Sequence, residues 1–421
     1  MTLLRTSFLN GIAVIVRMMT LLGINKILAI YVGPSGYAAL GQFQNAVQMI
    51  TVFASGAINT GVTKYTAEYH EEESKQYQVW RTAGSITLCG SLLASLVIAF
   101  FYKELASYFL KDPEFEGVFL WFAATLVFFT LNAYFLSILN GRKEVARYVV
   151  ANIAGSLFAL AITTLMAMNM GLYGALVALA IYQSLTFFVT LFICYRTKWF
   201  ELKNLFGQID GQVAKNLSKF ALMALASAIC VPISHIVIRN YLADQFGWDM
   251  AGYWEAMWRL SSAYLLMVTT TLSLYYLPKL SELVGGDALK KEIGHGYKII
   301  LPLVICCGLL IYLLRDFIIS VLFTSDFLPM RELFAWQMVG DTLKIGGWVL
   351  AYLMLGKAMF KMFVVAEILF SVLFVVLTRV FTEHWGWQGV TIAHAVNYLL
   401  YWLFVWCATY SLLNEKVKVE E

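Results

Sequence analysis

The stretches MGLYGALVALAIYQSLTFF (170–188) and WGWQGVTIAHAVNYLLYWL (385–403) align without gaps and decide how this chain is organised. Gly171 falls on Gly386, a second glycine follows three residues later in both copies, and a long apolar run follows each glycine turn. Self-similarity at a fixed distance is the signature of a structural repeat. The sequence therefore predicts that the second half of the chain repeats the fold of the first.

Two further turns support the repeat. NGRKEVAR (140–147) and LGKAMFK (355–361) both place a glycine before a basic residue at the end of an apolar run. GYAALGQFQNA (36–46) corresponds loosely to GWDMAGYWEAM (247–257), near the second run of each half. The matching segments occur in the same order in both halves.

The composition is that of a membrane protein. Of the 421 residues, 60% are hydrophobic and 13% are charged, whereas soluble domains are about 45–50% apolar and about 25% charged. A helix needs roughly 20 apolar residues to cross a bilayer. Twelve runs qualify, at 6–32, 37–63, 80–102, 118–139, 148–169, 173–195, 217–240, 251–277, 297–314, 331–355, 361–381 and 387–412. The predicted fold class is all-α: a polytopic membrane protein with 12 transmembrane helices.

The longest polar connection in the middle of the chain, 195–219, divides these helices into six and six. We predict an N-terminal lobe at 1–200, a cytoplasmic linker at 201–215 and a C-terminal lobe at 216–421. An even number of helices gives both halves the same orientation, so the repeats are parallel. Transporters commonly carry substrate between two such halves and alternate access by rocking one against the other. We therefore expect a central cavity between the lobes.

The basic residues predict the orientation of the helices. With the N-terminus in the cytoplasm, roughly two thirds of the 30 Lys and Arg residues fall in inner loops, as the positive-inside rule requires. Both termini are therefore predicted to be cytoplasmic. The inner loops can also attract anionic lipid head groups.

Several functional classes are disfavoured. The P-loop pattern GxxxxGK[ST] does not occur, so ATP hydrolysis by that route is not expected. The six cysteines lie in or beside apolar runs without metal-ligand spacing. No outer loop is long enough to suggest a large catalytic domain. We expect a protein that is not an enzyme and that has no cofactor and no metal site.

Ionised groups inside the apolar runs are the candidate functional residues, because burying a charge in a membrane costs at least about 2.5–3.5 kcal/mol. Glu255 and Arg259 are spaced i, i+4, and Asp341 and Lys344 are spaced i, i+3, so each pair shares a helix face. Each pair is either a self-neutralising structural pair or part of a polar cavity. The four candidate cavity cations are Arg17, Lys26, Arg259 and Lys344.

Other polar residues complete the candidate site. Gln44, Gln48 and Asn59 are predicted to form a polar stripe on one helix face, as a cavity wall or as interhelical hydrogen bonds. Glu367 has no close partner in sequence. Glu255, Asp341 and Glu367 are candidates for coupling to a proton or sodium gradient. A single histidine inside an apolar run, such as His394, is more often a packing or hydrogen-bonding residue than a ligand.

Three segments resemble a known family. GVTKYTAEYH (61–70), residues 216–265 and LFAWQMVGDTLKIGGWVLAYLMLGKA (333–358) are similar to Wzx-type flippases of the multidrug/oligosaccharidyl-lipid/polysaccharide exporter superfamily. The resemblance runs from about residue 17 to residue 401 and includes the turn Gly33-Pro-Ser-Gly36. It is specific for the family and weak for the cargo.

The resemblance implies two six-helix lobes around a central cavity and a cargo of oligosaccharide linked through diphosphate to undecaprenol. This cargo is either enterobacterial common antigen lipid III or an O-antigen repeat unit. Transfer would run from the inner to the outer leaflet of the bacterial inner membrane, alongside the polymerase and chain-length regulator of the same pathway. In the family, basic cavity residues are expected to meet the diphosphate, a role that would fall to the four cations named above.

Two alternatives stay open. A cation-coupled drug extruder could share the fold, although its usual cationic cargo suits a basic cavity poorly. A membrane glycan polymerase or ligase would also have many spans, but such enzymes usually need a large outer loop.

Overall fold

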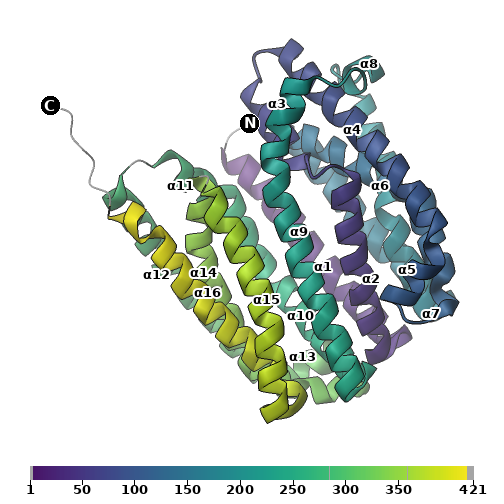
Figure 1. Ribbon diagram of the computed structural model, residues 1–421, viewed down its shortest axis with the longest axis vertical. Helices are drawn as coiled ribbons and strands as arrows, with labels where there is room; N and C mark the ends of the chain where they lie inside the picture. The colour runs from purple at the N-terminus through teal and green to yellow at the C-terminus, as the bar shows by residue number, and fades with distance from the viewer. Residues whose placement is uncertain (1–2, 284, 358, 415–421) are drawn as a thin grey trace. The chain divides into compact units, whose positions relative to one another are not determined.

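The computed structural model describes residues 3–283, 285–357 and 359–414, and within these ranges it contains helices and no β-strand (Figure 1). The all-α prediction is confirmed. The first half contains α1 (Leu3–Tyr31), α2 (Gly33–Ala54), α3 (Asn59–Glu68), α4 (Glu73–Phe100), α5 (Tyr102–Phe109), η1 (Pro113–Phe115), α6 (Glu116–Gly141), α7 (Val145–Tyr195) and α8 (Leu202–Leu205). The second contains α9 (Gly211–Phe246), α10 (Trp248–Thr271), η2 (Leu272–Tyr276), α11 (Leu277–Glu282), α12 (Gly286–Leu313), α13 (Arg315–Leu322), η3 (Ser325–Leu333), α14 (Phe334–Gly356), α15 (Phe360–Trp385), η4 (Gly386–Gln388) and α16 (Gly389–Leu413).

Every predicted apolar run overlaps a helix. Eight stretches of the described chain are long and apolar enough to cross a membrane, and two of them, Val145–Tyr195 and Phe360–Tyr410, contain 51 residues each. At about 1.5 Å per residue, such a stretch is more than twice the thickness of a bilayer core of about 30 Å. A multi-pass membrane protein is supported, and the count of twelve spans stays a prediction.

The glycine turns that define the repeat adopt the same backbone conformation. Gly171 interrupts α7 with φ 54°, and Gly386 ends α15 with φ 62°. Glycine adopts positive φ without the steric penalty that other residues meet. The aligned residues therefore make equivalent breaks between consecutive long helices.

The second glycine of each turn is also equivalent. A Cβ atom on Gly174 would lie 2.0 Å from the carbonyl oxygen of Met166, and one on Gly389 would lie 2.4 Å from that of Phe381. Each contacted carbonyl lies eight residues before its glycine, so both helices turn back against their predecessor in the same register. Helix lengths repeat as well: α4 and α12 have 28 residues, and the helices that follow them, α5 and α13, have 8.

The second predicted run, 37–63, is not one helix. α2 ends at Ala54, Gly56 and Ala57 have φ of 65° and 54°, and α3 begins at Asn59. Two consecutive residues with positive φ cannot continue a right-handed helix. The prediction that Asn59 extends the helix face of Gln44 and Gln48 was therefore wrong.

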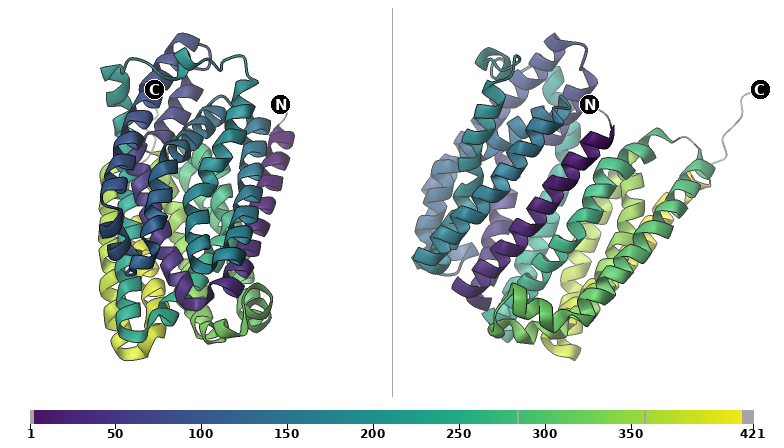
Figure 2. Two further views of the ribbon diagram at one scale, coloured as in Figure 1. Left: turned by 90° about the vertical axis from the view of Figure 1, so that its right-hand side faces the viewer. Right: turned by 180° about the vertical axis from the view of Figure 1, so that it is seen from behind.

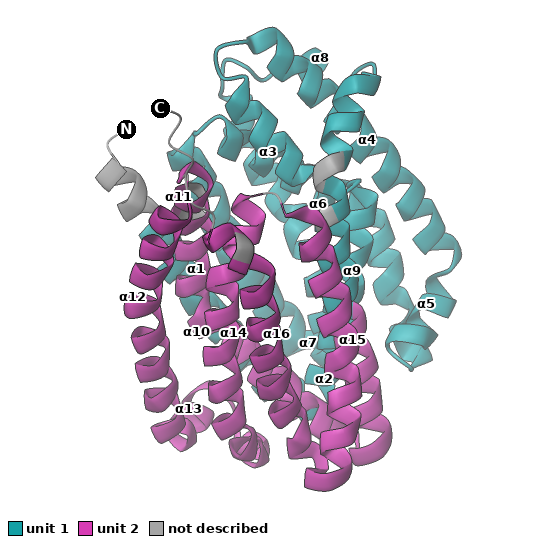
Figure 3. Ribbon diagram, turned by 60° about the vertical axis from the view of Figure 1, so that its left-hand side comes forward, with its two compact units in different colours: residues 1–232 teal, residues 233–421 magenta. Residues whose placement is uncertain are grey.

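The described chain forms two compact units, residues 1–232 and 233–421 (Figure 3). The division falls inside α9 at Pro232, a residue that cannot donate a helical hydrogen bond. Within unit 1, α7 packs along α6 and α1, and within unit 2, α16 packs along α14 and α15 (Figures 1 and 2). The lobe boundaries at 200, 201–215 and 216 remain a prediction about the repeat.

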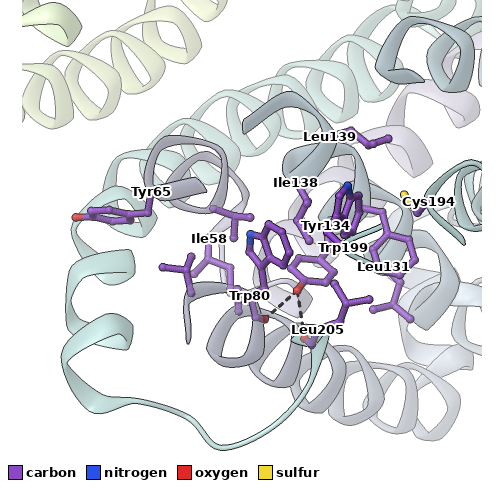
Figure 4. Packing of buried hydrophobic residues seen from close by; sticks show 14 of the residues in the cluster. Ile58, Tyr65, Trp80, Leu131, Tyr134, Ile138, Leu139, Cys194, Trp199 and Leu205 are labelled. Carbon is purple, nitrogen blue, oxygen red and sulfur yellow. Dashed lines mark hydrogen bonds between the residues drawn. The ribbon is translucent and has the colours of Figure 1, made fainter. Parts of the chain in front are cut away.

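The segment after α7 is held on unit 1 by buried side chains. The Tyr134 hydroxyl group donates hydrogen bonds to the carbonyl oxygens of Trp80 at 2.8 Å and Leu205 at 3.2 Å (Figure 4). Leu205 is fully buried, and Trp199 is 4% exposed. The first part of the predicted linker is thus packed into the core of unit 1.

Candidate functional site

The most concentrated group of buried charges lies in unit 2, where Glu255 of α10 is held between two arginines. Arg239 Nη2 on α9 donates to Glu255 Oε2 at 2.5 Å, and Arg259 Nε, one turn further along α10, donates to Oε1 at 2.8 Å. The exposed fractions of the Arg239, Glu255 and Arg259 side chains are 1%, 6% and 15%. The predicted Glu255–Arg259 pair is confirmed, and it is a trio with two positive charges and one negative charge.

A second buried carboxylate, Asp341 on α14, receives four hydrogen bonds. Its Oδ2 accepts from the hydroxyl groups of Ser261 at 2.6 Å and Tyr264 at 2.8 Å, both on α10. Its Oδ1 lies 3.1 Å from Gln337 Nε2 and 3.2 Å from His394 Nε2. The side chain is fully buried, and its donors replace the solvation that an ionised carboxylate loses on burial.

His394 faces Asp341 with one ring nitrogen. The other, Nδ1, is buried and has no hydrogen-bond partner among the described residues. A hydrogen on Nε2 and none on Nδ1 satisfies Asp341 without leaving a buried N–H group unpaired. The arrangement therefore fits a neutral His394 that donates to the carboxylate.

Lys344, one turn after Asp341 on α14, is surrounded by aromatic rings. Its Nζ lies 4.5 Å from the centre of the Trp258 ring, 4.8 Å from that of Trp348 and 5.5 Å from that of Tyr398. Within the residues that the structure describes, no ion pair joins Lys344 to Asp341. Ring faces attract a cation without cancelling its charge. The 7% exposed Lys344 is thus a buried cation stabilised by an aromatic cage of Trp258, Trp348 and Tyr398.

The Trp258 ring contacts histidines from two other helices. Its ring centre lies 4.3 Å from that of His235 on α9 and 5.6 Å from that of His394 on α16. Trp254, one turn earlier on α10, contacts the same His235 ring at 5.3 Å and lies 5.6 Å from the Arg239 guanidinium carbon. Side chains from α9, α10, α14 and α16 therefore form one polar and aromatic cluster inside unit 2.

Glycines on α14 bring α16 close enough for these contacts. A Cβ atom on Gly340 would lie 2.2 Å from His394 Cδ2, and one on Gly346 would lie 2.7 Å from the Trp402 ring. Small residues at a helix interface allow the backbones of membrane helices to approach closely. The glycines of this stretch therefore position His394 beside Asp341.

The remaining predicted site residues are not part of the cluster formed by α9, α10, α14 and α16. On unit 1, Arg17 is exposed on α1, and Lys26 is half-buried on the same helix. Gln44 and Gln48 are exposed on α2, and the half-buried Asn59 starts α3. Glu367 is half-buried on α15 of unit 2.

Sequence reasoning missed several residues of the cluster. Arg239 was not among the candidate residues, and the partner of His394, which was interpreted as a packing or hydrogen-bonding residue, was not identified. A signal was present on α14, where Gln337, Asp341 and Lys344 follow at i, i+4 and i+7 on one helix face. Among the described residues, no three His, Cys, Asp or Glu side chains gather in a way that could hold a metal ion.

Comparison with known proteins adds independent information. Residues 3–284 match the family described as "Polysaccharide biosynthesis protein". The chain is 30% identical over 402 residues to the lipid III flippases of Escherichia coli (strain K12) and Shigella flexneri, covering 95% of this chain and 96% of each relative.

Solved structures agree on the fold. The chain resembles a multidrug resistance MATE family transporter of the MOP superfamily in its inward-facing conformation, with a TM-score of 0.78 at 16% identity over 97% of this chain and 100% of that one. An outward-facing conformation of such a transporter gives a TM-score of 0.69 at 16% identity over 95% of both chains. At these identities the likeness establishes the fold alone. The family match and the full-length relatives show that this chain belongs to the polysaccharide biosynthesis protein family.

Proposed function

We propose that this chain is a flippase that moves undecaprenyl-diphosphate-linked oligosaccharide from the inner to the outer leaflet of the bacterial inner membrane. The cargo is enterobacterial common antigen lipid III or an O-antigen repeat unit. Full-length similarity to lipid III flippases supports this proposal. The protein would act as a transporter by alternating access and not as an enzyme.

The observation that carries the proposal is the environment of the buried Lys344 side chain. The buried Lys344 ammonium group faces three aromatic rings and forms no ion pair with a carboxylate in the described chain. Two further cations of the cluster, Arg239 and Arg259, flank Glu255. An anionic diphosphate is the chemical group that such cations would attract. Aromatic faces such as those of Trp254 and Trp258 also suit sugar rings.

The other predicted site residues would line the same transport path. Arg17 and Lys26 of unit 1 would join Arg259 and Lys344 in a cavity between two lobes, with Gln44 and Gln48 of α2 and Asn59 of the separate helix α3 as polar residues of its wall. Both termini would be cytoplasmic; residues 1–2 and 415–421 lie outside the described residues. The polymerase and chain-length regulator of the same pathway would be partners.

An ion gradient would drive the cycle, with Glu255, Asp341 and Glu367 as the candidate coupling residues. Asp341 is suited to this task because its four donors come from three helices, α10, α14 and α16. Protonation of the carboxyl group would weaken contacts to all of them together. Gln or Asn variants that keep the full gradient dependence of flipping would remove these residues from the proposal.

A drug extruder of the same fold is the main alternative. Such proteins usually export cations, which the buried Lys344 ammonium group would repel. A strain that lacks this chain should therefore keep normal drug susceptibility and accumulate the lipid-linked oligosaccharide. Increased susceptibility without that lipid would favour the extruder.

The direct test replaces Lys344 and measures flipping of a lipid-linked oligosaccharide in proteoliposomes. Lys344→Gln should reduce the flipping rate at least tenfold at equal protein content, because the free cation is lost. The matched control is Lys290→Gln, which removes one charge from an exposed position on α12. Wild-type flipping by Lys344→Gln would exclude this lysine as the diphosphate contact.

A further inference from the structure

An apolar groove opens at the end of α7 on unit 1, in residues to which the proposed transport assigns no role. It has a volume of about 600 Å³ and is lined by Phe188, Leu191, Phe192, Tyr195, Phe200, Glu201 and Leu202. Several lining side chains are open to the surroundings: Phe188 is 52% exposed, Tyr195 72% and Leu202 67%. The lining suits a hydrocarbon chain.

The wall of this groove that follows α7 is formed by Phe200, Glu201 and Leu202. Specific contacts hold this segment in place. Trp199 Nε1 donates a hydrogen bond to Glu144 Oε1 at 2.7 Å. The Phe200 ring packs at 6.0 Å against both Phe135 and Tyr195. The segment after α7 therefore forms a fixed wall.

The rim of the groove carries unneutralised positive charge. The Arg196 guanidinium carbon lies 4.3 Å from the centre of the Phe192 ring, and Lys198 is exposed two residues later. Neither forms an ion pair with any residue that the structure describes. Lys203 differs, because its Nζ is paired with Glu201 at 2.7 Å. Arg196 and Lys198 therefore leave a surplus of positive charge beside an apolar hollow.

The groove lies where the apolar stretch of α7 ends. That stretch runs from Val145 to Tyr195, and the basic residues follow directly. Aromatic and basic residues at the end of a span are typical of the membrane–water interface. A lipid at this level has its acyl chains beside the span and its head group beside the basic rim.

We propose that this groove binds one anionic glycerophospholipid of the membrane. Its acyl chain lies against Phe188, Phe192 and Leu202, and its phosphate group lies at Arg196 and Lys198. Charge complementarity selects the anionic head group, and the apolar lining requires the chain. The site is separate from the cluster in unit 2 and does not depend on the identity of the transported cargo.

The test is native mass spectrometry of the full-length protein, titrated with phosphatidylglycerol and, separately, with phosphatidylethanolamine. The wild-type protein should bind phosphatidylglycerol preferentially. The double variant Arg196→Gln/Lys198→Gln should lose this preference by roughly thirtyfold, since each of the two basic residues near a lipid surface contributes about 1 kcal/mol. The matched control Lys290→Gln/Lys291→Gln removes the same charge from exposed positions on α12 and should bind as the wild type does.

The groove is tested independently by Leu202→Gln, which should weaken binding of both lipids because it makes the lining polar. Circular dichroism checks that each variant is folded. Unchanged preference in Arg196→Gln/Lys198→Gln would overturn the proposal, and so would an equal loss in the α12 control. Displacement of the lipid by inorganic phosphate at similar concentration would show an anion site without a lipid groove and would overturn it as well.

Discussion

Lys344 Nζ lies 4.5 Å from the centre of the Trp258 ring, and no ion pair joins it, within the described chain, to Asp341 one turn earlier on α14. Asp341 is instead bound by Ser261 and Tyr264 from α10, among others. The two opposite charges share a helix face and are satisfied separately. Lys344 is therefore held by aromatic faces and not by an ion pair with its neighbour on the same helix.

Replacement of Lys344 by methionine should separate stability from function. The methionine side chain can fill the aromatic cage without the desolvation cost of a buried ammonium group. The lost cation–π attraction costs about 2 kcal/mol, and the relieved desolvation cost offsets it in part or in full. We therefore expect the free energy of unfolding to change by an amount between a gain of about 1 kcal/mol and a loss of about 2 kcal/mol. Flipping in proteoliposomes should fall at least tenfold. Thermal unfolding of the detergent-solubilised protein measures the first quantity.

A purely structural role of Lys344 gives the opposite pattern. In that case Lys344→Met would lower the unfolding temperature strongly, and the properly folded fraction would flip lipid at the wild-type rate. Lys344→Arg serves as the conservative control, because it retains the charge and also stacks on aromatic faces.

Removal of the negative charge at Glu255 should destabilise unit 2. Glu255→Gln leaves Arg239, which is 1% exposed, and Arg259 without their shared carboxylate. Breaking a buried ion pair from one side costs about 3–5 kcal/mol. The double variant Glu255→Gln/Arg239→Met should recover part of this loss, because the buried cation that bound this carboxylate is gone as well. Additive losses in this double-mutant cycle would show that the two residues do not interact.

The sequence allowed the long helices to be predicted, because each has a continuous apolar run. It also allowed the break at Gly171 and its partner Gly386 to be located, because the repeat aligned them. It did not reveal the break after α2. Gly56 inside an apolar run is compatible with a helix or with a turn, and packing decides between them. Asn59 was consequently placed on the wrong element.

The candidate site was partly predictable for a similar reason. Glu255 and Arg259 pair because their spacing on one helix dictates a shared face. Arg239 joins them only because α9 packs against α10, a long-range contact that spacing cannot reveal. The i, i+3 spacing of Asp341 and Lys344 allowed a pair, but residues from other helices supplied better partners to each. His394 was interpreted as a packing or hydrogen-bonding residue, but its partner Asp341 could not be predicted, because only the close approach of α16 to Gly340 brings the two together.

Alanine at the two repeat turns should cost similar free energy in the two units. Gly171 and Gly386 have φ of 54° and 62°, and no atom lies within 3.8 Å of a Cβ placed at either position. The penalty is thus conformational and should be about 1–2 kcal/mol for each variant. Gly294→Ala on α12 is the control, because its Cβ meets open space within a helix and should be neutral or stabilising. Thermal unfolding of the three variants provides the comparison, and unequal losses at the two turns would argue against their equivalence.

Alanine at Gly340 should move His394 away from Asp341. The added Cβ would lie 2.2 Å from His394 Cδ2, so the ring or one helix must shift, at a cost of about 1–3 kcal/mol. Gly340→Ala/His394→Ala should be more stable than the sum of the single losses predicts, because the clash is absent. Strict additivity in unfolding measurements would contradict this contact.

Replacement of Trp199 by phenylalanine should loosen the segment after α7 without removing its aromatic packing. The Nε1 group of Trp199 donates to the carboxylate of Glu144 at 2.7 Å, and a hydrogen bond to a charged group contributes about 1.5–3 kcal/mol. Without it, backbone amides of residues 200–206 should exchange hydrogen roughly tenfold faster, measured by mass spectrometry on the purified protein. Trp121→Phe is the control, since Trp121 is 52% exposed on α6 and should leave this exchange unchanged. Equal exchange in wild type and Trp199→Phe would mean that the other contacts of the segment, such as the hydrogen bonds from Tyr134 to Leu205 and from Arg81 to Lys203, hold it on unit 1 without Trp199.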